Sequence, residues 1–151
     1  MALIKLNNNK YAKVDKKYYE LLSYFNWYEN KQGYAANDSK PRQLMHRLVM
    51  NFPDCNIDHI NGDKLDNRLS NLRLCNQSEN TANAPKRKTN KSGFKGVSWN
   101  KRYSKWEAYL TKDYKHIFLG YHDSKESAAN AYNVGAVTYF GKFAKLNKVD
   151  A

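Results

Sequence analysis

Four polar residues in the middle of the chain have the types and spacing that phosphodiester chemistry requires. Asp58 and His59 are adjacent, and Asn71 and Asn80 follow them within residues 56–80, NIDHINGDKLDNRLSNLRLCNQSEN. An imidazole with an ordinary pKa near ~6.5 can take a proton from water at neutral pH. A carboxylate and an amide carbonyl are hard oxygen ligands for Mg2+ or Mn2+. Together these residues predict a one-metal phosphodiesterase site.

Each of the four residues has a separate expected role. His59 is the expected general base, and the amide of Asn71 is expected to orient its imidazole. Asp58 and Asn80 are the expected ligands of a metal that neutralises charge on the phosphorus and on the departing 3′ oxygen. Any of these residues taken singly is more often structural, and Asn67 or Asn71 is explained equally well as a turn cap. The chemical interpretation depends on the combination.

Strand geometry sets a condition on this site. Adjacent side chains of a strand point to opposite faces, so Asp58 and His59 share a site only if the strand ends there. The polar loop that begins at Asn61 predicts such an end. Asn80 lies four residues into a helix predicted over residues 77–84, from which its side chain can face back towards the hairpin.

The chain is strongly basic, but its positive charge is unevenly distributed. Lys and Arg number 26 against 14 Asp and Glu, a formal net charge of +12. Residues 46–84 carry four basic and five acidic side chains, whereas residues 85–92 carry four basic and no acidic ones. Basic flanks around a near-neutral centre suit a protein that grips a phosphate backbone beside a reaction centre. A generally basic protein of another class is the alternative.

The cysteine content and the hydropathy exclude two classes of protein. Cys55 and Cys75 are too few for a disulfide framework and lack the C-x-x-C spacing of a zinc site, so no structural zinc is expected. No apolar segment approaches the ~20 residues that span a bilayer, and the start of the chain lacks a secretory signal. We therefore expect a cytoplasmic protein with no membrane partner.

The pattern of apolar and turn residues predicts an α+β protein of several small modules. Residues 1–45 are expected to form a β-rich module. Its predicted elements are a hairpin over residues 4–14, a helix at 18–25 with Asp15 as N-cap, and strands at 27–28 and 33–36. Residues 46–84 are expected to form a ββα unit. Its predicted elements are a preceding helix at 43–51, strands at 55–59 and 72–75, and a helix at 77–84 capped by Asn76.

Residues 85–92, PKRKTNKS, are expected to form a basic linker. Lys86, Arg87 and Lys88 suit the negative potential of a DNA minor groove. A solvated tether that makes no DNA contact is the alternative.

Residues 93–147 are expected to form a three-stranded antiparallel sheet packed on one helix, followed by a tail at 148–151. The predicted elements are strands at 94–99, 106–111 and 115–121 and a helix at 123–140, with Asp123 and Glu126 as a capping box and Gly141 as its end. The inward face of this helix is mostly small, which predicts close packing on the sheet. Its residues are Ala128, Ala131, Tyr132, Gly135, Ala136 and Tyr139.

Strand alternation assigns two faces to the predicted sheet. Leu110, Leu119 and Tyr121 are expected on the face that meets the helix. The opposite face, which includes Tyr109 and Phe118, has no helix to cover it and is expected to enter a major groove. Packing of this face on another part of the protein is the alternative.

Residues 46–80 resemble the HNH endonuclease motif, most closely that of phage and intron-encoded homing endonucleases with a ββα-metal site. The elements HRLV, DHINGD, NR, NL and SEN occur in the family's order and spacing. The implied roles are general base for His59, imidazole orientation for Asn71, metal ligation for Asp58 and Asn80, and phosphate contact for Arg68 and Arg73. His46 of the HRL element is interpreted as structural. Residues 1–45 are similar to the region that often precedes this HNH type.

Residues 92–147 resemble the AP-two domain of plant ethylene-response factors, which reads the major groove with its sheet. The matching elements are GFKGVSW, KWEAYL and IFLGYHDSKESAANAY. Several arginines of the plant pattern are Lys, Ser, Thr or His here, so the strongest guanine-reading side chains are replaced. The residues expected by position to face DNA are Lys95, Ser98, Lys101, Arg102, Tyr109, Thr111, His116 and Phe118.

These resemblances imply a metal-dependent, site-directed endonuclease of the homing type that acts on double-stranded DNA. The implied cofactor is Mg2+ or Mn2+, the products carry 5′-phosphate and 3′-hydroxyl ends, and a phage-encoded protein would act in the bacterial cytoplasm. One HNH site cuts one strand at a time, so a monomer or a transient dimer on DNA is expected. A DNA-binding regulator with an inactive HNH fold and an RNA- or ribosome-associated basic protein are the alternatives.

Overall fold

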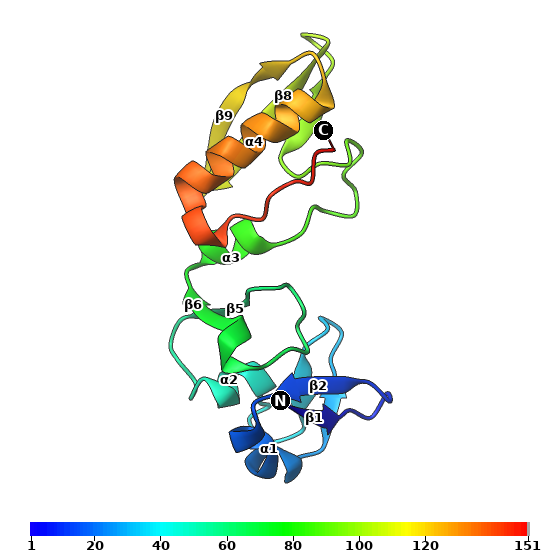
Figure 1. The fold of residues 1–151 in the computed structure, drawn as a ribbon, viewed down its shortest axis with the longest axis vertical. Coiled ribbons are helices and arrows are strands. Elements are labelled where there is room, and N and C mark those ends of the chain that lie inside the picture. The colour runs from blue at the N-terminus through cyan, green and yellow to red at the C-terminus, as the bar shows by residue number, and fades with distance from the viewer. Residues whose placement is uncertain (151) are drawn as a thin grey trace. The chain divides into compact units, whose positions relative to one another are not determined.

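The computed structural model describes residues 1–150, which divide into two compact units on either side of the boundary between Cys75 and Asn76 (Figure 1). Both units combine helices with small antiparallel sheets, so the predicted α+β class is confirmed. Within residues 1–150 no helix has the length and apolar character needed to cross a membrane.

The first unit contains three two-stranded antiparallel sheets and short helices. The strand pairs are β1 (Ala2–Lys5) with β2 (Tyr11–Val14), β3 (Trp27–Glu29) with β4 (Ala35–Asn37), and β5 (Asn56–His59) with β6 (Leu72–Cys75). The helices are α1 (Lys16–Ser23), α2 (Met45–Val49) and the 3-10 helix η1 (Leu69–Asn71). Apart from η1, which was not predicted, these elements lie where the sequence pattern predicts them, with ends that differ by a few residues.

One hydrophobic core joins the N-terminal strands to the β5–β6 hairpin. Leu6, Val14 and Trp27 are almost fully buried in the same cluster as Met45 and Leu72. Burial of such side chains is the main stabilising term for a unit of this size. The N-terminal elements therefore support the hairpin that carries the predicted site. The finer division of this unit at residue 45 stays a prediction.

The second unit is built on a three-stranded antiparallel sheet with α4 along one of its faces (Figure 1). The strands are β7 (Val97–Asn100), β8 (Lys105–Lys112) and β9 (Lys115–His122), in that order across the sheet. The helical elements are α3 (Gln77–Asn83), α4 (Lys125–Phe140) and the 3-10 helix η2 (Gly141–Phe143).

Small residues on α4 allow a close approach to the sheet, as predicted. Ala128 and Ala136 are fully buried. A Cβ atom added to Gly135 would lie 2.8 Å from the Leu119 side chain, so a larger residue would force the helix outward. Tyr139 differs from the prediction because it is 40% exposed.

The predicted sheet face of Tyr121 is wrong because a β-bulge interrupts strand alternation. The register between β8 and β9 shifts at Ala108 and Tyr109, which pairs Glu107 with Tyr121. A bulge adds one residue to a strand and so reverses the faces beyond it. Tyr121 consequently lies on the face away from α4, where its ring contacts that of Phe118 at 4.8 Å between centroids.

Of the two predicted N-caps in the second unit, the one at Asn76 is confirmed and the one at Asp123 is wrong. Asn76 caps α3 through the predicted side-chain bond to the Glu79 amide, and a full capping box is present. α4 begins after Ser124, whose hydroxyl accepts the Ser127 amide, so the predicted cap at Asp123 is wrong. The Asp123 carboxylate instead forms an ion pair with Lys105, the first residue of β8.

Candidate active site

The β5 strand ends at His59, and the β5–β6 ladder includes both Asp58 and His59, so strand alternation directs their side chains to opposite faces. A site shared by these two residues stays a prediction. Asp58 lies opposite Arg73 in the β5–β6 ladder, and His59 lies opposite Leu72. Asp58 and His59 are each 5% exposed, and a loop of residues 60–68 follows directly. The hairpin thus places an adjacent carboxylate and imidazole in the buried part of the first unit.

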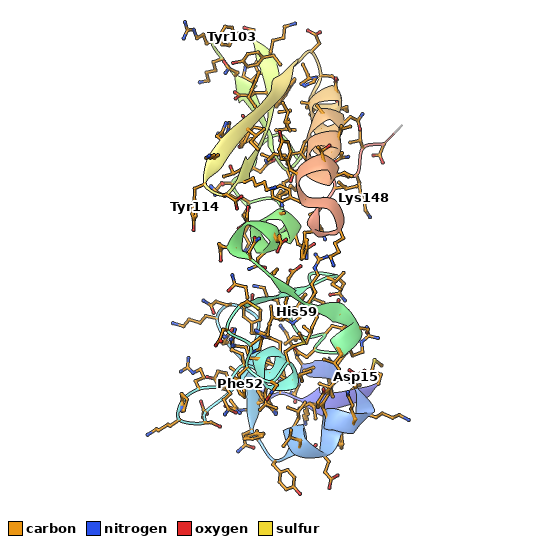
Figure 2. All side chains as sticks on the ribbon, turned by 90° about the vertical axis from the view of Figure 1, so that its left-hand side faces the viewer. Asp15, Phe52, His59, Tyr103, Tyr114 and Lys148 are labelled. Carbon is orange, nitrogen blue, oxygen red and sulfur yellow. The ribbon has the colours of Figure 1, made fainter. Side chains whose placement is uncertain are left out.

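The imidazole of His59 is fixed by Asn67 (Figure 2 labels His59). His59 Nε2 lies 3.1 Å from Asn67 Oδ1, and Asn67 Nδ2 donates to the Met45 sulfur at 3.5 Å. Because the amide nitrogen is used by Met45, the amide oxygen is the acceptor and Nε2 carries the proton. In a neutral ring the other nitrogen, Nδ1, is then the basic one.

Two aromatic rings enclose the imidazole of His59. The His46 ring packs edge-on against it at 5.2 Å between centroids, and the Tyr34 ring lies at 5.9 Å. Burial, with His59 next to it, lowers the pKa of His46 to about 3. Burial also lowers the pKa of His59, and burial followed by the charge of Asp58 raises the pKa of Tyr34. All three groups are therefore neutral at neutral pH.

Orientation of the imidazole by Asn71 stays a prediction, and the structure adds Asn67 as a residue that contacts the ring. Asn71 Nδ2 donates to the Asp66 carbonyl at 2.8 Å, and Asn71 Oδ1 accepts the Asn61 amide at 3.0 Å. Asn71 thus closes the loop between the two strands. Asn67, a fully buried residue of this loop, contacts the ring directly. Residue type and spacing do not reveal that contact.

A buried ion pair stiffens the same loop. Asp66 has no exposed surface and accepts from Arg68 at 2.7 Å and 2.6 Å and from Asn61 Nδ2 at 3.0 Å. The hydrogen bonds from Arg68 hold the pKa of Asp66 below its usual range. Charge-assisted bidentate pairs of this kind are the strong ones, so Arg68 fixes the loop in addition to its predicted phosphate contact.

The N-terminal elements hold the loop from the other side. The Lys13 amide donates to Leu65 and its carbonyl accepts from Asn67, both at 2.8 Å. Asp15 stands at the N-cap position of α1, but its carboxylate accepts the Leu69 amide at 2.9 Å. These long-range bonds give residues 1–45 a role in shaping the site that the sequence did not show.

Asp58 is paired with Arg73 across the hairpin. Arg73 Nε and Nη2 lie 2.8 Å and 2.7 Å from the same carboxylate oxygen, Oδ2. The Arg73 side chain is 13% exposed. The guanidinium supplies positive charge at the carboxylate, which is where the predicted divalent cation would bind. Because like charges repel, a divalent cation at Asp58 would have to share the carboxylate with this guanidinium or displace it.

The second predicted ligand, Asn80, lies on α3 in the second unit, where it is half-buried. Within residues 1–150 no three His, Cys, Asp or Glu side chains gather in a group that could hold a metal ion. The predicted ligand pair is a carboxylate and an amide, which suits an ion that takes most of its ligands from water and phosphate.

The outer face of the β7–β9 sheet, defined by the side chains away from α4, is aromatic and basic. The Tyr109 and His116 rings stack at 4.6 Å, and Tyr121 contacts Tyr103 at 4.8 Å. Tyr103 and Tyr114 mark the two ends of this sheet (Figure 2). The predicted DNA-facing residues that are exposed are Lys101, Arg102, Thr111, His116 and Phe118, while Ser98 and Tyr109 are partly buried. Lys86, Arg87 and Lys88 of the linker are exposed as well.

Lys95 is the exception among the predicted DNA-facing residues. Its ammonium donates to the carbonyls of Thr81, Ala82 and Ala84 at the end of α3. The prediction that Lys95 faces DNA is therefore wrong, because its three donors are used within the protein.

Comparison with known proteins agrees with the geometry of the hairpin. The profile of the HNH endonuclease family matches residues 51–82. An uncharacterized HNH endonuclease of Acanthamoeba polyphaga mimivirus is 30% identical over 157 residues, which span 99% of this chain and 81% of that protein. Protein 3.8 of Escherichia phage T7 is 37% identical over 90 residues, 60% of this chain and 74% of that protein.

A plant protein shows a shorter similarity. An AP2-like ethylene-responsive transcription factor of Arabidopsis thaliana is 33% identical over 75 residues, which span 43% of this chain and 24% of that protein. No solved structure matches the chain.

Proposed function

The chain belongs to the HNH endonuclease family, and from this we propose that it is a metal-dependent, site-directed DNA endonuclease of the homing type. The observation that carries the proposal is the buried imidazole of His59, which Asn67 contacts at Nε2 and which follows Asp58 directly in the sequence. A neutral, oriented imidazole can act as the general base of phosphodiester hydrolysis, and a carboxylate can hold the metal.

In the proposed reaction His59 acts as the general base. Its Nδ1 takes a proton from a water molecule as the water oxygen forms a bond to phosphorus. The bond from phosphorus to the 3′ oxygen breaks, and that oxygen leaves with a proton returned from solvent. The products are a 5′-phosphate and a 3′-hydroxyl. Proton transfer by a positioned group contributes about 10²- to 10⁴-fold to the rate.

Asp58 and Asn80 are the proposed ligands of Mg2+, with Mn2+ as a substitute. A divalent cation, when bound, stabilises the charge that develops on the phosphoryl group and on the departing oxygen. Asp58 supplies the charged ligand, and Arg73 keeps that carboxylate ordered and compensated through its paired nitrogens. Asn80 is assigned by its position in the SEN element of the motif.

The second unit is proposed to deliver the nuclease to double-stranded DNA. Its sheet and helix resemble an AP-two domain, and its outer face exposes Lys101 and Arg102 beside aromatic rings. Basic side chains supply affinity for phosphate, and apolar rings can contact thymine methyl groups. The virus-encoded relatives support action in the cytoplasm of an infected cell, as a monomer or a transient dimer on DNA.

The test is nicking of supercoiled plasmid that contains the native target. We expect cleavage in Mg2+ or Mn2+, its loss with a chelator and its return when the metal is restored. Asp58→Ala should abolish nicking, whereas Asp54→Ala, which removes an exposed carboxylate of the same segment, should not. DNA ligase should reseal the nicks, because it requires a 5′-phosphate and a 3′-hydroxyl. Nicking that persists with Asp58→Ala contradicts the metal assignment.

The ion pair at Asp58 favours a second function, a DNA-binding regulator with an inactive HNH fold. In that case Arg73 occupies the carboxylate permanently and no cation replaces it. Tight binding to the native target without cleavage in any divalent ion supports this function. Chelator-sensitive nicking contradicts it.

A further inference from the structure

The C-terminal end of α3 is closed by a lysine from a distant part of the second unit. The last carbonyls of a helix have no partner within the helix. Lys95 Nζ donates to the carbonyls of Thr81 at 3.1 Å, Ala82 at 2.5 Å and Ala84 at 2.6 Å. An ammonium has three donors, so these three acceptors satisfy it completely, and its positive charge complements the helix end.

The backbone of Lys95 is itself held by the body of the unit. Its amide donates to Asn147 Oδ1 at 2.7 Å, and Asn147 Nδ2 donates back to its carbonyl at 2.9 Å. Asn147 is in turn bonded to the Asn133 side chain on α4 through both of its backbone groups, at 2.8 Å and 3.0 Å. The Lys145 amide adds a bond to the Ala82 carbonyl at 3.2 Å. A continuous set of hydrogen bonds therefore runs from α4 to α3.

α3 depends on these contacts for its position. It has seven residues, which is too few for an isolated helix to be stable in water. Its N-terminal part is held by the Asn76 capping box and by the Asp113 amide, which donates to Ser78 Oγ at 3.1 Å. Both ends of α3 are thus anchored in the second unit, and Asn80 lies between the anchors.

We propose that Lys95, held by Asn147 and Asn133, is a positioning residue that fixes α3 and with it the metal ligand Asn80. The inference rests on the proposed function. Burial, with Lys145 nearby, lowers the pKa of Lys95 to about 8, so the ammonium form still prevails at neutral pH.

The test compares Lys95→Met with Lys101→Met in the full chain. The same substitution removes a half-buried ammonium at α3 in one variant and an exposed ammonium of the sheet turn in the other. The readouts are hydrogen exchange of the α3 amides, affinity for a native-target duplex, and single-turnover cleavage at saturating DNA. For Lys95→Met we expect α3 exchange and cleavage to change by about tenfold or more, the size expected for lost charged hydrogen bonds, with affinity unchanged.

Lys101→Met should give the opposite result, with weaker affinity and normal α3 exchange. Asn147→Ala should show the Lys95→Met pattern in weaker form. Unchanged α3 exchange in Lys95→Met overturns the inference, as does a loss of affinity equal to that of Lys101→Met. Loss of the β7–β9 sheet amide protection in both Lys95→Met and Asn147→Ala also overturns it, because Lys95 is then a general stability residue. Failure of the proposed function would appear as a wild-type protein that does not cleave. Hydrogen exchange tests the role of Lys95 in α3 independently of cleavage.

Discussion

Asp58 and His59 in the first unit are each 5% exposed, whereas Phe118 and Tyr103 on the outer sheet face are 50% and 51% exposed. The first pair has polar partners, Arg73 at one carboxylate oxygen and Asn67 at one ring nitrogen. The second pair contacts neighbouring rings and leaves half of its surface to solvent. Chemistry needs a preorganised, compensated setting, while recognition of a polyanion needs accessible surface. In the proposed function the first unit supplies the base and the charged metal ligand, and the second unit supplies Asn80 and the DNA-facing surface.

The largest expected effect comes from removing the contact to the imidazole. Asn67→Ala should lower the single-turnover cleavage rate by about a hundredfold, because a displaced general base loses its alignment with the water. Affinity for DNA should not change. Cleavage at the wild-type rate would show that the burial of the ring, rather than Asn67, sets its orientation.

Asn71→Ala tests a residue whose side chain bonds to the loop backbone, and its effect is compared with that of Asn67→Ala. Loss of its two bonds to Asn61 and Asp66 should lower the free energy of unfolding of the first unit by about 1–3 kcal/mol. Residue-resolved hydrogen exchange should show the loss in residues 60–71. A rate loss with unchanged stability would return Asn71 to the role that the sequence predicted.

Acid should destabilise the first unit through His46. Its pKa is about 3 in the folded protein and near the ordinary ~6.5 when unfolded, so only the unfolded chain binds the proton between these values. Stability should therefore fall as the pH drops below ~6.5, by at most about 1.4 kcal/mol per pH unit from this group, and level off below about 3. Denaturant titrations followed by NMR measure the slope. His46→Phe should make it shallower, and an unchanged slope would contradict the assignment.

DNA affinity should depend on the exposed basic side chains of the second unit. Lys101→Met and Arg102→Met should each weaken binding and reduce the slope of log affinity against log salt by about 1. Asn67→Ala in the first unit serves as the control and should leave the slope unchanged. Equal slopes for all three variants would mean that the outer sheet face does not contact phosphate.

The smallest expected effect concerns the linker. Replacement of Lys86, Arg87 and Lys88 by Gln should reduce affinity by a few fold if the linker lies in a minor groove. An unchanged salt slope would identify the linker as a solvated tether instead. The same duplex binding assay distinguishes the two.

Local patterns predicted the elements well and tertiary contacts less well. The cap at Asn76, the small face of α4 and the end of β5 at His59 depend on neighbouring residues, and all were predicted. The contact between Asn67 and His59 depends on a loop that packs against Lys13, some fifty residues earlier, so spacing within the motif cannot reveal it.

The same limit explains the errors in the second unit. The predicted place of Lys95 followed from its neighbours in sequence, while its actual partners lie at the end of α3, 11 to 14 residues before it. The face of Tyr121 depends on a single bulge, which a period of two residues cannot anticipate.

Single-turnover cleavage of the native target by His59→Ala tests most directly whether His59 is the base of a DNA endonuclease. The assay uses saturating DNA and Mg2+, with affinity and folding measured in parallel. We expect a rate at least about a hundredfold below the wild type, with affinity for the duplex retained. Cleavage by His59→Ala at the wild-type rate would contradict the assignment of His59 as the base.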